Sequence, residues 1–234
     1  MDATTTVWGE IQGREITFPM EVPEMNAATL LFTVPADAAA ALLPGDAFDV
    51  VEVAPGQAQL IIAACDYRQN PWGDYNELNF GFLARPVGAT DDVIGSFIYR
   101  MPVNQEFTSE AGSTVMGFPK TVEVLDVDYT DTTVSFRLTM GGHLAIALTL
   151  PRAEALDEPE RLESDCYSYL DGVAHATPLS MDMGTGFVDP SEVTIDLGDG
   201  PLADELRSLG LPRAPDLATW GEALSATFLL GKPV

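Results

Sequence analysis

Apolar and polar residues alternate along much of this chain, and that alternation limits the possible folds more than any other feature. In the stretch 121–129, Val122, Val124 and Val127 stand between acidic residues, and 132–140 repeats the pattern after a turn at Asp131-Thr132. A period of two residues is typical of a β-strand with one buried face. Together with several compact apolar runs, it predicts strands at 29–34, 59–64, 78–83, 94–99, 121–129, 132–140, 143–150 and 193–197.

Helices are expected in only two short places. The alanine-rich segment 37–43 lies between Pro35 and Pro44-Gly45, and 202–209 ends before Gly210, a residue suited to a helix C-cap. The charged segment 151–163 is interpreted as exposed and compatible with a helix. Many antiparallel strands with few helices predict one domain over 1–234, mainly β with flanking helices (α+β), built as an antiparallel barrel or a packed pair of sheets.

Charge and composition argue against several classes of partner. The net charge of −25 disfavours nucleic acid and anionic membrane surfaces, because both repel a polyanion. No stretch approaches the roughly 20 apolar residues of a membrane span, and the first ten residues lack the basic and apolar regions of a signal peptide. Cys65 and Cys166 are the only cysteines and form no paired motif. We therefore expect a cytoplasmic protein whose Cys65 is a buried structural thiol.

Motifs for cofactors and metals are missing from the sequence. GxGxxG, the Walker loop, HExxH and GxSxG do not occur. The two histidines, His143 and His175, occupy settings typical of structural histidines, and no cluster has the spacing of metal ligands. We therefore expect neither a metal nor a cofactor.

Three short segments, in order along the chain, carry residues that could form a site. They are Gly13-Arg14-Glu15, Gly73-Asp74-Tyr75-Asn76-Glu77 and Met116-Gly117-Phe118-Pro119-Lys120. In this order they resemble the acetoacetate decarboxylase family. The resemblance implies an antiparallel β-barrel or cone, a small-molecule carbonyl substrate and a homo-oligomer. It also implies that Arg14 holds a substrate carboxylate and that Glu77 lies beside the reacting carbon.

The lysines depart from the pattern that the family implies. Family members carry a lysine pair a few residues before the motif that resembles Gly117 to Lys120, and its first lysine attacks the substrate ketone. Without a gap these positions fall on Thr114 and Val115, and a small gap moves them only within 111–113. Nothing between Arg100 and Lys120 is basic. The usual nucleophile is therefore missing from its expected place.

Our first hypothesis is chemistry without an imine. Arg14 would anchor an anion, and Glu77 would act as general acid and base. Thr114 or Ser113 would hydrogen-bond a substrate oxygen, and the pocket would be lined in part by Tyr75 and Tyr99. This describes a cofactor-independent lyase or isomerase/cyclase acting on a small oxo acid or a polyketide-like β-dicarbonyl.

Two alternatives remain open at this point. Lys120 could be a displaced Schiff-base lysine of a decarboxylase or aldolase, although a carboxylate such as that of Glu123 would stabilise its ammonium form and oppose nucleophilic attack. Alternatively, the chain could be a non-catalytic protein of the same fold that binds a small molecule.

Overall fold

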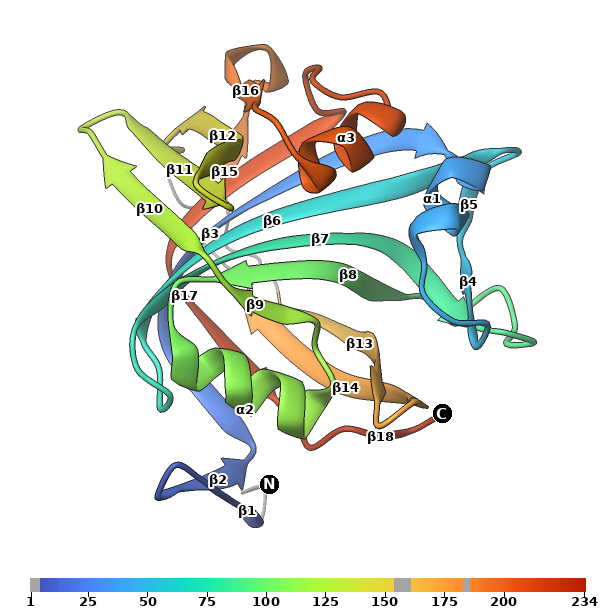
Figure 1. Cartoon of the computed structure of the whole chain (residues 1–234), viewed down its shortest axis with the longest axis vertical. Coiled ribbons are helices and arrows are strands. Elements are labelled where there is room, and N and C mark those ends of the chain that lie inside the picture. Colours follow the sequence, from blue (N-terminus) through green and yellow to red (C-terminus); the bar gives the residue numbers. More distant parts are fainter. Residues whose placement is uncertain (1–4, 154–160, 183–185) are drawn as a thin grey trace.

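The computed structural model describes residues 5–153, 161–182 and 186–234, and strands dominate it (Figure 1). The strands are β1 (Thr6–Ile11), β2 (Arg14–Phe18), β3 (Met20–Pro35), β4 (Phe48–Val50), β5 (Glu52–Ala54), β6 (Gln57–Gln69), β7 (Tyr75–Pro86), β8 (Gly95–Val103), β9 (Lys120–Val122), β10 (Val124–Tyr129), β11 (Thr133–Met140), β12 (His143–Pro151), β13 (Arg161–Leu170), β14 (Val173–Asp182), β15 (Gly186–Val188), β16 (Thr194–Leu197), β17 (Leu217–Phe228) and β18 (Lys232–Pro233). The helices are α1 (Ala36–Leu42), α2 (Glu106–Met116), α3 (Pro201–Ser208) and the short 3-10 helix η1 (Pro190–Glu192).

Seven of these strands close into a barrel. Their order is β17-β3-β6-β7-β8-β13-β14, and β14 pairs with β17 to complete the ring. Neighbours in the ring are antiparallel except β8 and β13, which are parallel. Closure gives every ring strand a partner on both sides, although β8 and β13 pair at only two positions, Ser96 with Cys166 and Phe97 with Tyr167. The prediction of a mainly β fold with flanking helices around an antiparallel barrel is confirmed.

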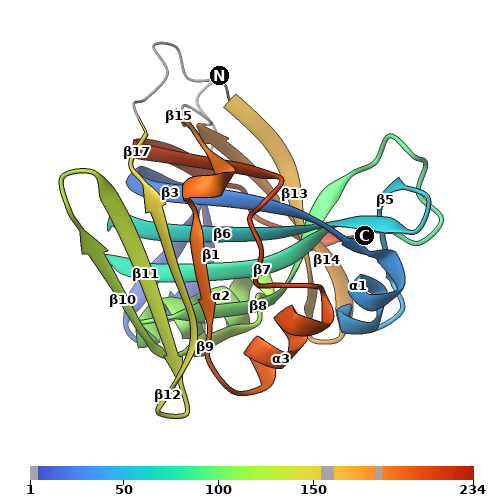
Figure 2. The ribbon, with the colours of Figure 1, turned by 90° about the horizontal axis from the view of Figure 1, so that it is seen from above.

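A second sheet, in the order β10-β11-β12-β16, packs against one side of the barrel. Seen from above, it lies near one end of the long strands β6 and β7, and α1 lies near their other end (Figure 2). The two-residue turn at Gly141 and Gly142 joins β11 to β12 as predicted, and both glycines have positive φ, which few other residues adopt. The predicted strand at 121–129 is two strands, because the chain changes partner at Glu123 between β9 and β10.

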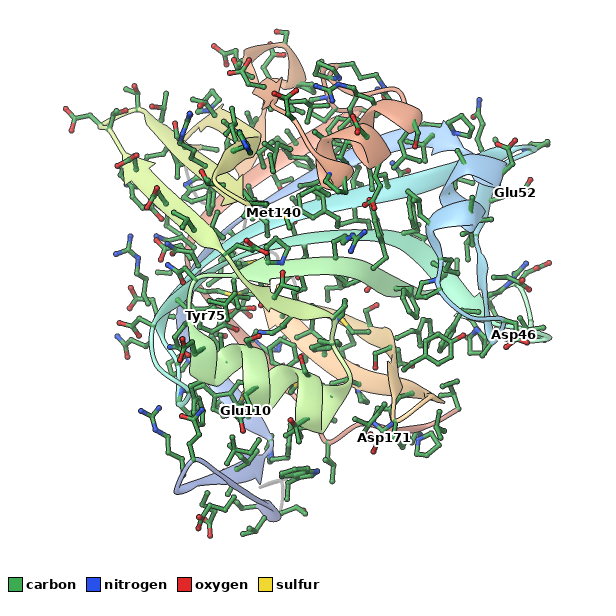
Figure 3. All side chains as sticks on the ribbon, in the orientation of Figure 1. Asp46, Glu52, Tyr75, Glu110, Met140 and Asp171 are labelled. Carbon is green, nitrogen blue, oxygen red and sulfur yellow. The ribbon has the colours of Figure 1, made fainter. Side chains whose placement is uncertain are left out.

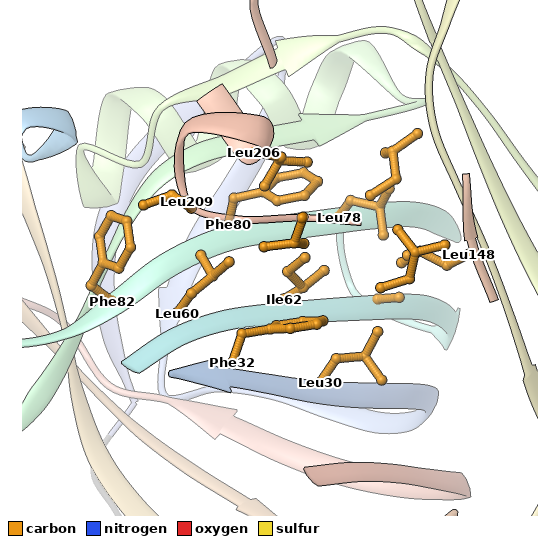
Figure 4. Close-up of a cluster of buried hydrophobic side chains, with 14 of the residues drawn as sticks. Leu30, Phe32, Leu60, Ile62, Leu78, Phe80, Phe82, Leu148, Leu206 and Leu209 are labelled. Carbon is orange, nitrogen blue, oxygen red and sulfur yellow. The ribbon is translucent and has the colours of Figure 1, made fainter. Parts of the chain in front are cut away.

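One face of the barrel sheet forms the hydrophobic core, and the other face lines the inside of the barrel. In the middle of β3, β6 and β7 the even-numbered side chains, at 28–34, 58–64 and 78–84, are buried, and Phe32, Ile62 and Phe80 are among them. They pack against Leu148 of the second sheet and Leu206 of α3 (Figure 4). Burying each such side chain stabilises the fold by about 1.5–3 kcal/mol. The odd-numbered side chains point into the barrel, where the fold leaves space for a site.

Helix α2 was not predicted, and it positions the segment that resembles the family motif. Gln105 caps its N-terminus by accepting a hydrogen bond from the Thr108 amide at 2.9 Å. Gly117 ends it in the left-handed conformation with φ 69°. Phe107, Ala111 and Val115, spaced four apart, form its buried stripe and were the available sequence signal.

Helix α2 also holds the first hairpin in place. Glu110 on its outer side accepts a hydrogen bond of 2.6 Å from Gln12 in the turn between β1 and β2 (Figure 3). The short helices α1 and α3 agree with the two predicted helices. The predicted exposed segment 151–163 lies largely outside the described residues. None of the described helices is long and apolar enough to cross a membrane.

Candidate active site

The barrel encloses a cavity of about 320 Å³ whose wall is largely apolar. Side chains from the ring strands, α2 and the start of β9 form this wall. Six of its polar and ionisable members meet in one region: Lys120, Glu77, Tyr75, Tyr67, Cys65 and Asn79. Thr29, Ser96, Ser164 and Cys166 line the cavity elsewhere. We call this cavity the lumen cavity.

Lys120 and Glu77 form a buried ion pair in the wall of the lumen cavity. Lys120 Nζ lies 2.7 Å from Glu77 Oε2, and the two side chains are only 4% and 5% exposed. The Lys120 ammonium also donates to Tyr75 Oη at 3.3 Å and to Thr108 Oγ1 at 3.1 Å. It sits 4.8 Å from the centre of the Tyr75 ring, which lies at the start of β7 (Figure 3).

The other oxygen of the Glu77 carboxylate, Oε1, accepts hydrogen bonds from neutral donors. Asn79 Nδ2 donates to Glu77 Oε1 at 3.0 Å, and the Tyr67 hydroxyl donates to the same oxygen at 3.4 Å. Tyr67 also stacks on Tyr75, with ring centres 4.4 Å apart. The carboxylate is therefore fixed with one oxygen facing the amine of Lys120.

Strand register brings the two charged residues together from distant parts of the sequence. Strand β8 lies between β7 and β9, with Glu77 opposite Val103 on one side and Lys120 opposite Met101 on the other. The chain reaches β9 directly after the α2 C-cap and Pro119. The register of β8 with its two neighbours thus sets the separation of the amine and the carboxylate.

Opposing influences act on the pKa of Lys120. Burial lowers it, but the Glu77 carboxylate and the Tyr75 side chain together raise it above its ordinary value. The resting amine is therefore an ammonium held by Glu77. Burial also raises the pKa of Tyr75 to about 12, and it raises that of the Cys65 thiol, so both stay protonated near neutral pH.

Arg14 lines a different hollow from Lys120 and Glu77. That hollow measures about 430 Å³ and lies beside the β1–β2 hairpin. The Arg14 guanidinium lies over Phe107 of α2, 4.5 Å from the ring centre. Met20 and Trp72 line both spaces, so they lie in the wall between them.

The other residues singled out in the sequence fall outside the lumen cavity, except Tyr75. Ser113 Oγ donates to the Phe118 carbonyl at 3.0 Å, and Thr114 is exposed on α2. Tyr99 packs in the opposite core, where it stacks on Phe82 with ring centres 5.2 Å apart. The structure therefore brings together Glu77, Lys120 and Tyr75, and it separates them from Arg14, Ser113, Thr114 and Tyr99.

Several cavity residues were not singled out as site residues by the sequence analysis. Tyr67, Asn79 and Thr108 bind the ion pair, and Cys65, interpreted as a structural thiol, lines the cavity. The alternation within β6 could have placed Cys65 and Tyr67 on one face. Only strand register places that face opposite Glu77 and Tyr75.

Comparison with known proteins agrees with this architecture. The model of the family described as acetoacetate decarboxylase (ADC) matches residues 10–228, nearly the whole chain. The chain belongs to the acetoacetate decarboxylase family. No curated protein matches it.

Solved structures show the same fold at low sequence identity. Acetoacetate decarboxylase from Legionella pneumophila superposes with a TM-score of 0.64 at 16% identity, covering 92% of this chain and 87% of the other. The enduracididine biosynthesis enzyme MppR gives 0.61 at 16% identity, over 94% and 89%. An acetoacetate decarboxylase-like enzyme from Sphingomonas wittichii gives 0.56 at 14% identity, over 92% of each chain. MppR has been solved with pyruvate and with the condensation product of pyruvate and imidazole 4-carboxaldehyde.

Proposed function

We propose that this protein is a cofactor-independent lyase in which Lys120 forms an imine with a carbonyl substrate and Glu77 moves the protons. The observation that carries the proposal is the buried pair of Lys120 and Glu77, 2.7 Å apart in the wall of an apolar cavity. It favours the displaced Schiff-base lysine over chemistry anchored by Arg14, because Arg14 lines another hollow.

The ion pair supplies the proton transfers that imine formation needs. Glu77 takes a proton from the Lys120 ammonium, which frees the amine lone pair to bond to the carbonyl carbon. A proton passes from nitrogen to the former carbonyl oxygen and gives a carbinolamine. Glu77 then returns its proton to that hydroxyl, which leaves as water. The products are an iminium on Lys120 and the Glu77 carboxylate, so charge and atoms balance.

The raised pKa of Lys120 fits this sequence of steps. A Glu77 carboxylate that stabilises the resting ammonium also stabilises the iminium, because both are cations at the same position. In a β-hydroxy carbonyl substrate the iminium withdraws electrons from the carbon–carbon bond beside it, which breaks with its electron pair in an enamine. The hydroxyl-bearing fragment leaves as an aldehyde, and Glu77 accepts the proton of its hydroxyl group. Protonation of the enamine carbon and hydrolysis then release the amine. The carbonyl ligands solved in the relative MppR support a carbonyl substrate for this chain as well.

Reductive trapping tests the proposal directly. The purified protein is incubated with a panel of aldehydes, ketones and oxo acids, reduced with borohydride, and analysed by intact mass and peptide mapping. We expect one adduct, on Lys120, and none in the Lys120→Met variant. Lys232, the other lysine of the chain, is exposed on β18 and serves as the internal reference for nonspecific labelling. The Lys232→Arg variant should trap normally. The absence of Lys120 labelling by every member of the panel would overturn the proposal.

A further inference from the structure

We propose that the substrate is an uncharged carbonyl compound with an extended apolar chain, and that this chain lies along the barrel lumen from Lys120 toward Leu83. The placement of its carbonyl rests on the proposed imine with Lys120. That the substrate carries an apolar chain and no charge is inferred from the shape and lining of the lumen cavity.

The lumen cavity extends well beyond the ion pair. Four residues of β7 line it, Tyr75, Glu77, Asn79 and Leu83, and Leu83 lies six positions beyond Glu77 along the strand. At about 3.3 Å per residue, this span is roughly 20 Å. The cavity volume of about 320 Å³ lies in the range of ~300–1,000 Å³ typical of pockets that bury whole ligands. A short oxo acid would fill only the end beside Lys120.

Small side chains at the middle of the lumen create this room. Ala27, Thr29 and Ala63 line the cavity from β3 and β6, and Thr29 pairs directly with Ala63 across the two strands. On the opposite face of the same sheet, large side chains such as Phe32 and Phe80 fill the core completely. Thr29 and Ala63 are only partly buried, although both lie in the middle of long strands. The space above them is therefore part of the cavity.

Away from the ion pair the cavity is lined mainly by apolar side chains. Leu31 and Ile61 face one another across β3 and β6, and Ile98, Leu179 and Phe228 contribute from other ring strands. Besides Thr29, the polar lining residues there are Ser96, which lies opposite Leu83, Ser164 and Cys166, and all three are uncharged. An apolar chain placed there would gain the free energy of leaving water without losing hydrogen bonds. We therefore assign this region of the cavity to the apolar part of the substrate.

Charge in the cavity argues against an anionic substrate. Among the described lining residues only Lys120 and Glu77 are charged, and they neutralise each other at 2.7 Å. A carboxylate deeper in the cavity would lose its hydration and meet no cation in that lining. The protein as a whole carries −25 charges, which disfavours the approach of anions. An uncharged substrate avoids both the loss of hydration of a buried charge and the repulsion by the acidic protein.

Chain length and charge can be varied separately in the experiment. A series of methyl ketones of increasing length is compared with β-oxo acids of matched length, and the rate of Lys120 labelling is measured at low ketone concentration. We expect labelling efficiency to rise about tenfold for every two added methylene groups until the cavity is full. Each oxo acid should label more slowly than the ketone of equal length. Equal labelling across the series, or faster labelling by the acids, would overturn the inference.

A variant that shortens the cavity links the length dependence to its residues. Ala63→Leu should abolish the gain for long ketones, so that long and short ketones label Lys120 with similar efficiency. Ala54→Leu makes the same change on the exposed strand β5 and should behave like the wild type. If labelling of Ala63→Leu still rose with ketone length as in the wild type, the assignment of the substrate's apolar chain to the lumen would be contradicted.

A second measurement separates this inference from the proposed imine. Long-chain alcohols cannot form an imine, so their effect on thermal unfolding reports binding alone. We expect a long alcohol to raise Tm more than a short one or an equally long carboxylate. If no carbonyl labels Lys120 but the long alcohol still stabilises the protein, the proposed function fails and the apolar, uncharged lumen site stands. If the carboxylate stabilises more than the alcohol, the inference fails whatever the labelling shows.

Discussion

Gly112 of α2 lies directly against the side chain of Lys120. A Cβ atom at Gly112 would fall 2.7 Å from Lys120 Cε and 2.8 Å from Cδ, closer than such atoms approach one another. Glycine inside a helix costs about 1 kcal/mol relative to alanine. The helix therefore carries a residue that weakens it at the place where the lysine passes toward Glu77.

Replacing this glycine should displace the amine without changing any charge. In Gly112→Ala the flexible end of Lys120 must move away from the new methyl group, and small misplacements of a reacting group can be costly. We expect the rate of borohydride-trapped labelling to fall about tenfold or more while the far-ultraviolet circular dichroism stays that of the wild type. Thr114→Ala, on the exposed side of the same helix, is the matched control. Wild-type labelling in Gly112→Ala would show that Lys120 needs no such position.

The Glu77→Gln variant should make Lys120 easier to deprotonate. Burial lowers the pKa of Lys120 and the Glu77 carboxylate raises it, so removing the carboxylate leaves burial as the main influence. Labelling requires the neutral amine, so its rate rises with pH through the pKa of Lys120. We expect the midpoint of this profile to shift to lower pH in Glu77→Gln. Turnover should nevertheless fall, because Glu77 no longer moves protons. An unchanged midpoint would contradict the coupling of the two residues.

The ion pair should also contribute measurably to the free energy of unfolding. Lys120→Met leaves the Glu77 carboxylate buried without its partner, which typically costs about 3–5 kcal/mol of unfolding free energy. The double variant Lys120→Met/Glu77→Gln removes both charges and should recover most of that loss. Urea unfolding of the wild type, both single variants and the double variant gives the coupling energy. A loss in the double variant equal to the sum of the single losses would show that the pair is not coupled.

The contribution of the ion pair to the free energy of unfolding should decrease at high pH. The pKa of Lys120 is raised in the folded state, so the stabilisation from its ammonium is complete below the ordinary lysine pKa of about 10.5. It is lost as pH rises through the higher folded value. The stability difference between the wild type and Lys120→Met should therefore be constant near neutral pH and shrink above about pH 10.5. A difference that grows with rising pH would have the wrong sign.

Arg14 offers a test between the two catalytic hypotheses. It lines a hollow separated from Lys120 by Met20 and Trp72, so Arg14→Gln should leave the labelling of Lys120 by a neutral ketone within about twofold of wild type. The measurement is the labelling rate at several ketone concentrations. A loss of labelling comparable to that in Lys120→Met would show that Arg14 takes part in the reaction at Lys120.

Much of the strand pattern could be predicted because alternation and turn residues are local signals. The hairpin turn at Gly141-Gly142 and the predicted helices at 37–43 and 202–209 agree with the structure. Helix α2 was missed, although Phe107, Ala111 and Val115 have helical spacing, because Gly112 and the Ser and Thr residues around it have low helix propensity. The prediction that Glu123 would be the carboxylate near Lys120 followed sequence distance, whereas strand register places Glu77 there.

The sequence by itself determined a mainly β chain of the acetoacetate decarboxylase family with few lysines and a set of candidate polar residues. These properties follow from residue types and short-range spacing. The tertiary structure decided which candidates share a cavity, because barrel closure and the register of β7, β8 and β9 bring Glu77 to Lys120 and leave Arg14 outside. It also decided that the carboxylate meets a buried lysine across 2.7 Å, a contact between residues too far apart along the chain for any local pattern to specify.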